Sequence, residues 1–271
     1  MKIYDCFSYL DEDLLLEIRL NILDKFVDYF VIVEGNKTWQ NNHKKLKFNI
    51  DKFKRFKEKI IYIPLNNMPD GNNPYLRENY QRNAIQKGLE KAEDDDLILI
   101  SDLDEIPNPK KIKNFKIEMR YAVFKQMHFY YKLNLQSQIN PHWFGSRICV
   151  KKFLKSPQWL RDLKFKKRPF WRIDKIRLNH IIDDGGWHFC NLKEPEKILY
   201  KYKNLCETDD PHVFKEKIDE KYLNLEEIKK RIEKRQDIVG RTEEYLPINL
   251  DLRFPDYILN KKKDLKDWIV D

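Results

Sequence analysis

The sequence contains no apolar run that approaches the roughly 18 residues a helix needs to cross a bilayer. It also shows no signal peptide, since residues 1–5 (MKIYD) lead directly into a strand-like stretch. The four cysteines are widely spaced and form no C-x-x-C pair. Such isolated cysteines are typical of small buried side chains in a reducing compartment. These absences predict a soluble, cytoplasmic protein.

The 271 residues also contain no Gly-rich phosphate-binding loop, no internal repeat and no low-complexity linker. Nothing in the composition marks a clean domain boundary. A chain of this length can bury a substantial core. The sequence therefore predicts one large domain, or one domain with an elaborated second half.

Positive charge is in excess, because 53 lysines and arginines outnumber 44 acidic residues and give a net charge of +9. Such a balance favours polyanionic partners: nucleotides, phosphorylated glycolipids, an anionic membrane surface or nucleic acid. The basic residues are interleaved with acids, and no nucleic-acid-binding motif is present. A basic nucleic-acid-binding protein is therefore kept only as the non-enzyme alternative.

The most informative stretch runs from an apolar segment, residues 97–100, directly into a cluster of acids. The apolar segment predicts a buried strand, and Asp102, Asp104 and Glu105 follow at its carboxyl end, where open α/β sheets bind ligands. Asp102 and Asp104 can converge only if the backbone turns between them. Paired carboxylates there would bind Mg²⁺ or Mn²⁺, with a nucleotide diphosphate as the natural partner. The alternative is a turn in which Asp102 or Asp104 caps the next helix.

The order of the elements predicts an α/β protein with a mostly parallel central sheet and helices on both faces. In the first hundred residues we expect strands over 2–8, 29–35, 59–64 and 97–100 and helices over 11–23 and 75–92. The second half predicts a short helix over 109–115, an aromatic strand or hairpin over 120–133, a strand over 142–151, helices over 194–202, 212–222 and 225–235, and a final stretch that packs back on the domain.

Several polar or aromatic side chains outside the acidic cluster are candidates for donor contacts. Glu34 ends the strand over 29–35 and would contact a base or ribose; a solvated acid is the alternative. Arg77, Asn79 and Arg82 lie on a helix whose amino end points toward the same edge, although this polar run also fits a solvated face. Trp143 stands beside a small residue, as in proteins that stack on sugar rings, but such aromatics also form core.

A second constellation, residues 181–189, places two acids and a paired-glycine turn before Trp187 and His188. Asp183 or Asp184 would supply a general base, and His188 a metal ligand. A hairpin turn with a structural histidine is the alternative interpretation.

Five segments in this order together resemble glycosyltransferase family 17 over roughly residues 1–200: FVIVEG (30–35), REN-x-QRN (77–83), ISDLDEIPNP (100–109), Trp143-x-Gly145 and GGWHF (185–189). The resemblance implies a GT-A-type nucleotide-diphospho-sugar transferase fold over 1–200, with a helical C-terminal extension over 201–271 packed on the same domain. It further implies a divalent metal and an inverting transfer from a nucleotide sugar, with UDP-GlcNAc the best-known donor of the family.

Carried over to this chain, the resemblance makes Asp102, Asp104 and His188 the ligands of Mn²⁺ or Mg²⁺. Glu105 would orient the donor sugar or a metal-bound water, and Asp183 or Asp184 would deprotonate the acceptor hydroxyl. Arg77, Arg82 or a lysine would assist the departing diphosphate.

The expected acceptor is a glycan or glycolipid. The expected context is bacterial or viral surface glycan synthesis at the cytoplasmic face of an anionic membrane. The rival enzyme class is a haloacid dehalogenase-like phosphatase or phosphotransferase, which also places Asp-x-Asp after an apolar strand. That class normally carries its nucleophile on its first core strand. Here at least two strands precede the motif, which favours the transferase.

Overall fold

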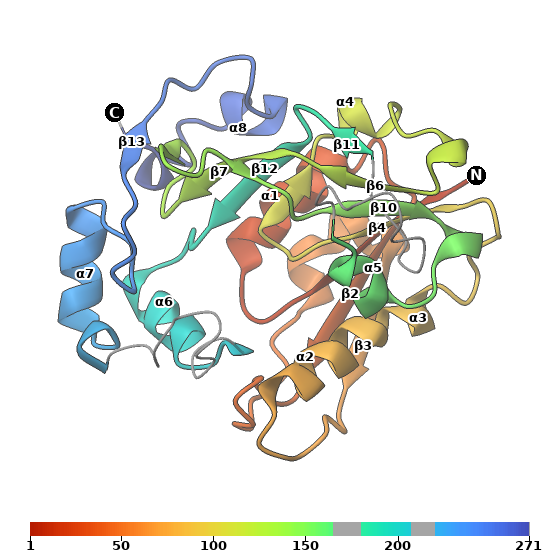
Figure 1. Ribbon diagram of the computed structural model, residues 1–271, viewed down its shortest axis with the longest axis horizontal. Helices are drawn as coiled ribbons and strands as arrows, with labels where there is room; N and C mark the ends of the chain where they lie inside the picture. The colour runs from red at the N-terminus through yellow and green to blue at the C-terminus, as the bar shows by residue number, and fades with distance from the viewer. Residues whose placement is uncertain (165–179, 207–219, 271) are drawn as a thin grey trace, which may run out of the picture.

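The computed structural model describes residues 1–164, 180–206 and 220–270 and shows a mixed α/β fold with two β-sheets (Figure 1). The first sheet has seven strands in the order β11-β6-β10-β4-β1-β2-β3. Its parallel half confirms the strands expected in the first hundred residues; the inner strands have neighbours on both sides, and the strand at 60–65 forms an edge of the sheet. These strands are β1 (Ile3–Ser8), β2 (Tyr29–Gly35), β3 (Ile60–Leu65) and β4 (Leu97–Ile100).

The other half of this sheet is partly antiparallel. β10 (Arg147–Val150) runs antiparallel to both β4 and β6 (Tyr121–Phe124), while β11 (Ile181–Ile182) pairs in parallel with β6. Apolar side chains of β6 and β10 continue the core beyond β4. Beyond the parallel strands, the central sheet is therefore mixed.

Helices cover both faces of the first sheet. One face packs on α1 (Asp13–Leu23), whose apolar side chains join the largest core cluster. The opposite face is covered by α2 (Pro74–Asn83), α3 (Ile85–Gly88) and α5 (Pro157–Asp162). The single helix expected over 75–92 is wrong: it breaks at Ala84 and ends at Gly88, which packs directly against Val31 of β2.

A second sheet, which the sequence analysis did not predict, has the order β13-β8-β7-β12-β5, with β9 also paired to β7. Its strands are short, and they come from distant parts of the chain. They are β5 (Glu105–Pro107), β7 (Gln126–Tyr130), β8 (Leu135–Ser137), β9 (His142–Trp143), β12 (Gly186–Cys190) and β13 (Tyr245–Pro247).

Four stretches of the chain pass from one sheet to the other. β4 leads into β5, β6 into β7, β9 into β10, and β11 into β12. The hairpin alternative for 120–133 is therefore wrong, and the strand expected over 142–151 is two strands in different sheets. The acidic turn, residues 101–104, is one of the four crossings, which confirms that the backbone leaves strand geometry between Asp102 and Asp104.

The crossing before β12 depends on Gly186, and we expect Gly186→Ala to lower the free energy of unfolding by about 2–4 kcal/mol. Gly186 has φ +131°, and an added Cβ would overlap the carbonyl oxygen of Ile106. Gly71→Ala is the matched control, since Gly71 has φ +117° with nothing near its Cβ position. Urea denaturation of both variants measures the difference, and equal losses would show that the contact with β5 does not matter.

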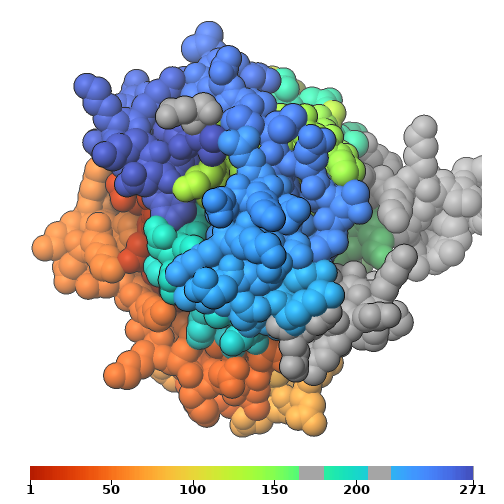
Figure 2. Space-filling view, turned by 90° about the vertical axis from the view of Figure 1, so that its left-hand side faces the viewer, coloured from red at the N-terminus to blue at the C-terminus, as the bar shows by residue number. Residues whose placement is uncertain are grey.

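The C-terminal part packs on the second sheet. Buried side chains of β7 and β8 meet those of α6 (Pro195–Tyr202), α7 (Leu225–Glu233) and β13. Late segments, coloured cyan to blue, occupy the centre and top of the face seen in Figure 2. The final stretch packs back as predicted, because Phe254 and Ile258 of the region around α8 (Asp256–Asn260) join the main core. The division of the chain at residue 200 stays a prediction.

The remaining elements are short. The helix expected over 109–115 is α4 (Pro109–Ile112), while that over 212–222 lies mostly outside the described residues. Five single-turn or irregular 3₁₀ segments complete the described chain: η1 (Ile50–Lys59), η2 (Ile117–Met119), η3 (Lys151–Phe153), η5 (Glu220–Tyr222) and η6 (Lys266–Trp268). Across the described ranges, every helix is too short or too polar to span a membrane.

Candidate active site

A buried arginine holds the acidic turn between β4 and β5 in place. Arg19 of α1 donates to the carbonyl oxygens of residues 102, 103 and 105 over 2.8–3.1 Å and to Ser101 Oγ over 2.6 Å. Its guanidinium also forms a bidentate ion pair with Asp5 of β1, at 2.6 and 2.7 Å. Both side chains are completely buried. The turn that carries Asp102 and Asp104 is therefore held rigidly against the first sheet.

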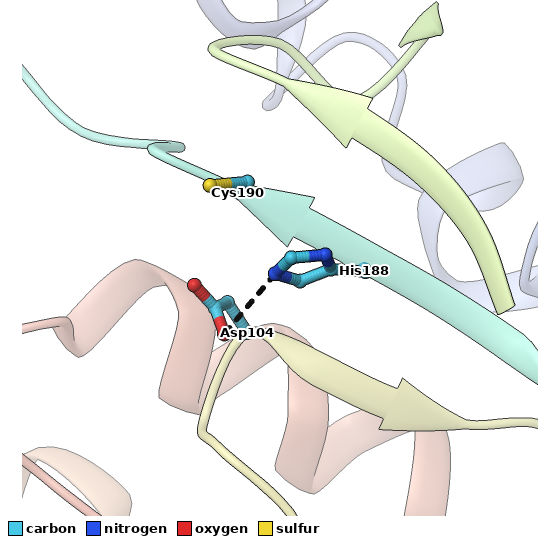
Figure 3. Close-up of side chains that lie close together, drawn as sticks. All are labelled: Asp104, His188 and Cys190. Atoms are coloured by element: carbon cyan, nitrogen blue, oxygen red, sulfur yellow. Dashed lines mark ion pairs between the residues drawn. The ribbon is translucent and has the colours of Figure 1, made fainter. Parts of the chain in front are cut away.

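Asp104 meets His188 and Cys190 at the edge of the second sheet (Figure 3). One oxygen of Asp104, Oδ1, lies 3.6 Å from His188 Nε2, and the other, Oδ2, lies 3.5 Å from Lys201 Nζ of α6. The carboxylate, the imidazole and the Cys190 thiol each offer a ligand atom within 4.8 Å of one another.

Strand pairing explains why these groups meet. β12 runs antiparallel to β5, with His188 opposite Glu105, so Asp104 lies beside the following residues of β12. The backbone confirms this position, because Phe189 N donates to Asp104 O over 2.9 Å. His188 and Cys190 are two residues apart on one strand and hence project from the same face.

Charges within this group strongly shift the pKa values. Burial raises the pKa of the Asp104 carboxyl, but Lys201 and His188 outweigh that effect and lower the pKa well below its usual range. Burial lowers the pKa of His188, yet the adjacent Asp104 carboxylate outweighs it and raises the pKa to about 10. Without a metal ion, His188 therefore carries a proton at neutral pH, and a bound cation would replace that proton.

Asp102 points toward a different set of partners. It forms ion pairs with Arg82 of α2, at 3.2 Å, and with Arg161 of α5, at 2.9 Å, while 42% of its side chain stays exposed. Burial raises the pKa of Asp102, but the positive charges of Arg161 and Arg82 outweigh that effect and lower the pKa below its usual value. This carboxylate remains ionised and accessible to a ligand, with two guanidinium groups beside it.

Glu105 lies behind Asp102 and is only 1% exposed. It accepts hydrogen bonds from Arg161 Nη1 over 2.8 Å, from Trp143 Nε1 over 2.7 Å and from the backbone amide of Asp102 over 3.0 Å. A side chain on Gly145 would overlap the Glu105 carboxylate, so the close approach requires glycine there. Glu105 thus joins the acidic turn, Trp143 and Arg161 into one rigid unit.

Aromatic rings line the exposed side of this unit. His188 stacks on His128 with ring centroids 4.9 Å apart and also lies 4.9 Å from the ring of Trp143. Burial and the neighbouring His188 lower the pKa of His128 to about 4, so that ring stays neutral. Trp143 keeps 41% of its surface exposed, which leaves an indole face available to a sugar ring.

The structure does not bring every residue that was predicted to contact the donor close to the acidic turn. Glu34 is completely buried and accepts from Lys44, Tyr62 and two backbone amides. Arg77 is 1% exposed and donates to the carbonyl oxygens of Trp39 and Gly71. Asn79 is half-buried on α2. Glu34 and Arg77 thus act within the protein interior in this structure and are not exposed to a ligand.

The two acids proposed as the general base also lie apart from Asp104. Asp183 and Asp184 are 74% and 81% exposed and pair with Lys125 and Lys111. They lie in the turn that precedes β12, at the end of the strand opposite Cys190. The structure therefore brings neither carboxylate into contact with the Asp104 group.

Sequence reasoning missed four residues that shape the site. Arg19 could have been found, because it interrupts the apolar face of its helix. Cys190 could also have been found, since it follows His188 with the two-residue period of a strand. Arg161 and Lys201 lie on polar helices and carry no distinguishing local signal.

Divalent metal ions fit the chemistry of this donor set. A carboxylate, a neutral imidazole and a thiolate are all metal ligands, and a distance of 3.6 Å between two of the donor atoms matches neighbouring ligands at bond lengths of about 2.0–2.3 Å. His188 Nδ1 is buried without a hydrogen-bond partner in the described part of the chain.

Comparison with known proteins identifies the family of this chain. The model of glycosyltransferase family 17 matches residues 1–247, and the chain therefore belongs to glycosyltransferase family 17. Among curated proteins it is similar to the human, rat and mouse enzymes named beta-1,4-mannosyl-glycoprotein 4-beta-N-acetylglucosaminyltransferase, each 23% identical over 231 residues. The alignments cover 73% of this chain and 42% of the human protein, or 41% of the rat and mouse proteins. This chain thus matches less than half of each relative.

Proposed function

We propose that this protein is a metal-dependent, inverting glycosyltransferase with a GT-A-type fold, which transfers a sugar from a nucleotide-sugar donor to a glycan or glycolipid acceptor. The observation that carries the proposal is the pair of aspartates on one rigid turn, Asp104 beside His188 and Asp102 beside two arginines, in a chain of family 17. Family membership favours this activity over the phosphatase and nucleic-acid-binding alternatives.

Each part of the site has a chemical role in this proposal. Asp104 and His188, with Asp102 nearby, would hold Mn²⁺ or Mg²⁺, which when bound neutralises negative charge on the donor diphosphate. Arg82, Arg161 and Lys201 would stabilise the departing diphosphate by charge-assisted hydrogen bonds. Trp143 would stack on a sugar ring, and Glu105 would hold the indole and Arg161 in place.

The general base stays a prediction. Asp183 and Asp184 are exposed and ionisable, but they would reach an acceptor hydroxyl near Asp104 only if the acceptor extended along β12. Glu105 is the one acid of the three predicted catalytic residues that adjoins Asp102, and its bonds to Arg161 and Trp143 suit an orienting role.

UDP-GlcNAc is the donor that we propose, because the relatives are named as N-acetylglucosaminyltransferases. We further propose a cytoplasmic enzyme in bacterial or viral surface glycan synthesis, held at the inner face of the membrane by its net charge of +9. Sedimentation with anionic liposomes at low salt tests the membrane contact, and an absence of binding would contradict it.

Asp104→Asn tests the donor site. We expect UDP or UDP-GlcNAc with Mn²⁺ to stabilise the wild-type protein by about 2.7 kcal/mol at a hundredfold excess over Kd, because a ligand that binds only the folded state stabilises it by mass action. The variant should lose this stabilisation, since an amide is a weaker metal ligand than a carboxylate. Thermal-shift assays with UDP, GDP, CMP and their sugar conjugates measure the effect and identify the nucleotide.

Asp264→Asn is the matched control, because Asp264 pairs with Lys261 on the exposed surface and should leave the stabilisation unchanged. If no nucleotide stabilises the wild type in the presence of Mn²⁺, the proposal fails. Release of phosphate from simple phosphomonoesters would instead support the phosphatase alternative.

A further inference from the structure

The group around Asp104 contains a sulfur atom that the Asp-x-Asp motif does not include. Among the described residues, Asp104, His188 and Cys190 form the set of His, Cys, Asp and Glu side chains whose ligand atoms converge, all within 4.8 Å. Figure 3 shows the thiol on the same strand as the imidazole, with the Asp104 carboxylate facing the imidazole. The predicted ligand set of two aspartates and one histidine offers oxygen and nitrogen ligands but no sulfur.

Asp102 is directed elsewhere in this structure. Its two carboxylate oxygens pair with Arg82 and Arg161, so both are already matched with positive charge. Asp104 differs, because its Oδ1 faces His188 while its Oδ2 faces Lys201. A cation bound through Oδ1 would leave the ion pair with Lys201 intact. The third ligand group that converges with this carboxylate and the imidazole is Cys190.

Cys190 also differs from other cysteines in the described chain. Cys6, Cys149 and Cys206 are buried, whereas Cys190 is half-exposed at the carboxyl end of β12. An incoming cation can therefore reach its thiol without opening the core. The next residue, Asn191, has a positive φ of 54°, and the strand ends at the cysteine.

We propose that Cys190 is a metal ligand, and that Asp104 Oδ1, His188 Nε2 and Cys190 Sγ together form a site that prefers thiophilic divalent ions such as Zn²⁺ or Co²⁺ to Mg²⁺. The inference rests on the proposed function for the presence of a metal at Asp104, and it deepens that proposal by naming a ligand and the class of ion. When the sulfur–metal bond forms, the thiol proton passes to solvent and no electrons are transferred.

The preference follows from the chemistry of the ligands. Mg²⁺ is a hard ion that requires oxygen ligands in near-octahedral geometry, whereas thiolate and imidazole favour Zn²⁺ and Co²⁺. Three protein ligands leave a position open, as in catalytic metal sites, and a phosphate oxygen of a donor has the charge to occupy it.

Titration with Co²⁺ tests the proposal, because a cobalt–thiolate bond produces a near-ultraviolet charge-transfer band that oxygen and nitrogen ligands do not. We expect the band in the wild-type protein and its loss in Cys190→Ser. The Kd for Zn²⁺, measured by calorimetry, should weaken at least about tenfold, since loss of even an outer partner of a metal ligand costs that much. Binding of Mg²⁺ should stay within about threefold, because Mg²⁺ gains little from sulfur.

Cys149→Ala is the matched control, because Cys149 is completely buried in β10 and should leave both the band and the Zn²⁺ affinity unchanged. A second measurement uses the unaltered protein and so does not depend on folding of a variant. Zn²⁺ should slow alkylation of Cys190 by iodoacetamide, read by mass spectrometry, at least about tenfold more than Mg²⁺ does, because thiolate prefers Zn²⁺.

Failure of this inference is distinguishable from failure of the proposed function. If Co²⁺ binds without the band and Zn²⁺ does not protect Cys190, the thiol is not a ligand, whatever the response to UDP-GlcNAc. If the band forms but no nucleotide stabilises the protein, the metal site stands and the transferase proposal fails.

Discussion

Replacing Arg19 with methionine is expected to lower the free energy of unfolding by about 3–5 kcal/mol, the cost typical of removing one partner from a buried ion pair. The guanidinium is the bidentate partner of Asp5, and both side chains have no exposed surface. Methionine has a similar length but donates no hydrogen bond. The substitution would leave the Asp5 carboxylate buried without a counter-charge and three carbonyl oxygens of the acidic turn without their donor.

Urea denaturation followed by tryptophan fluorescence measures this effect. Arg55→Met is the control, because Arg55 is an exposed arginine that pairs with Asp24 and should change stability by no more than about 1 kcal/mol. In the double variant Asp5→Leu/Arg19→Met the buried charge is gone, so part of the loss should be recovered. Equal stability of Arg19→Met and Arg55→Met would show that the buried pair does not hold the turn.

Arg161→Gln is expected to reduce donor turnover by about 100-fold, which is the scale of loss when catalytic groups shift by about 1 Å. Arg161 binds Asp102 and Glu105 at once, with nitrogen–oxygen distances of 2.9 and 2.8 Å. Glutamine cannot make both ion pairs, so Glu105 would lose its buried counter-charge and Asp102 would keep only Arg82. Arg161→Lys should recover only part of the activity, because an ammonium cannot reproduce the planar fork.

Two assays measure the effect. The first follows release of UDP from UDP-GlcNAc, the proposed donor, with an acceptor-free reaction as baseline. The second measures stabilisation of the protein by UDP and Mn²⁺. Arg231→Gln provides a matched control. Arg231 is, like Arg161, an arginine with a largely buried side chain. It pairs with Glu227 at 2.8 Å on α7, away from the acidic turn. Its substitution should cost stability without changing turnover per folded molecule. If both variants lost activity equally, the effect would come from folding and not from positioning of Asp102.

Local pattern was sufficient for the strands of the first hundred residues. Each is a mainly apolar run bounded by polar residues, and each pairs with at least one parallel neighbour. The acids after β4 were found for a similar reason, because they come directly after an apolar strand, at its carboxyl end. The single helix expected over 75–92 is instead two helices that meet at Ala84, and the second ends at Gly88, where a side chain would overlap Val31 of β2.

The sequence by itself determined the parallel half of the first sheet and the acidic turn, because these depend on residues close together in the chain. Only the tertiary structure decided the second sheet, whose pairing joins residues as far apart as Leu135 and Pro247. It likewise decided that Glu34 and Arg77 are interior, that Asp183 is remote, and that Arg19, Arg161, Lys201 and Cys190 shape the site. The physical reason is that burial, ion pairing and metal ligation depend on neighbours in space, and here those neighbours come from segments that no local pattern connects.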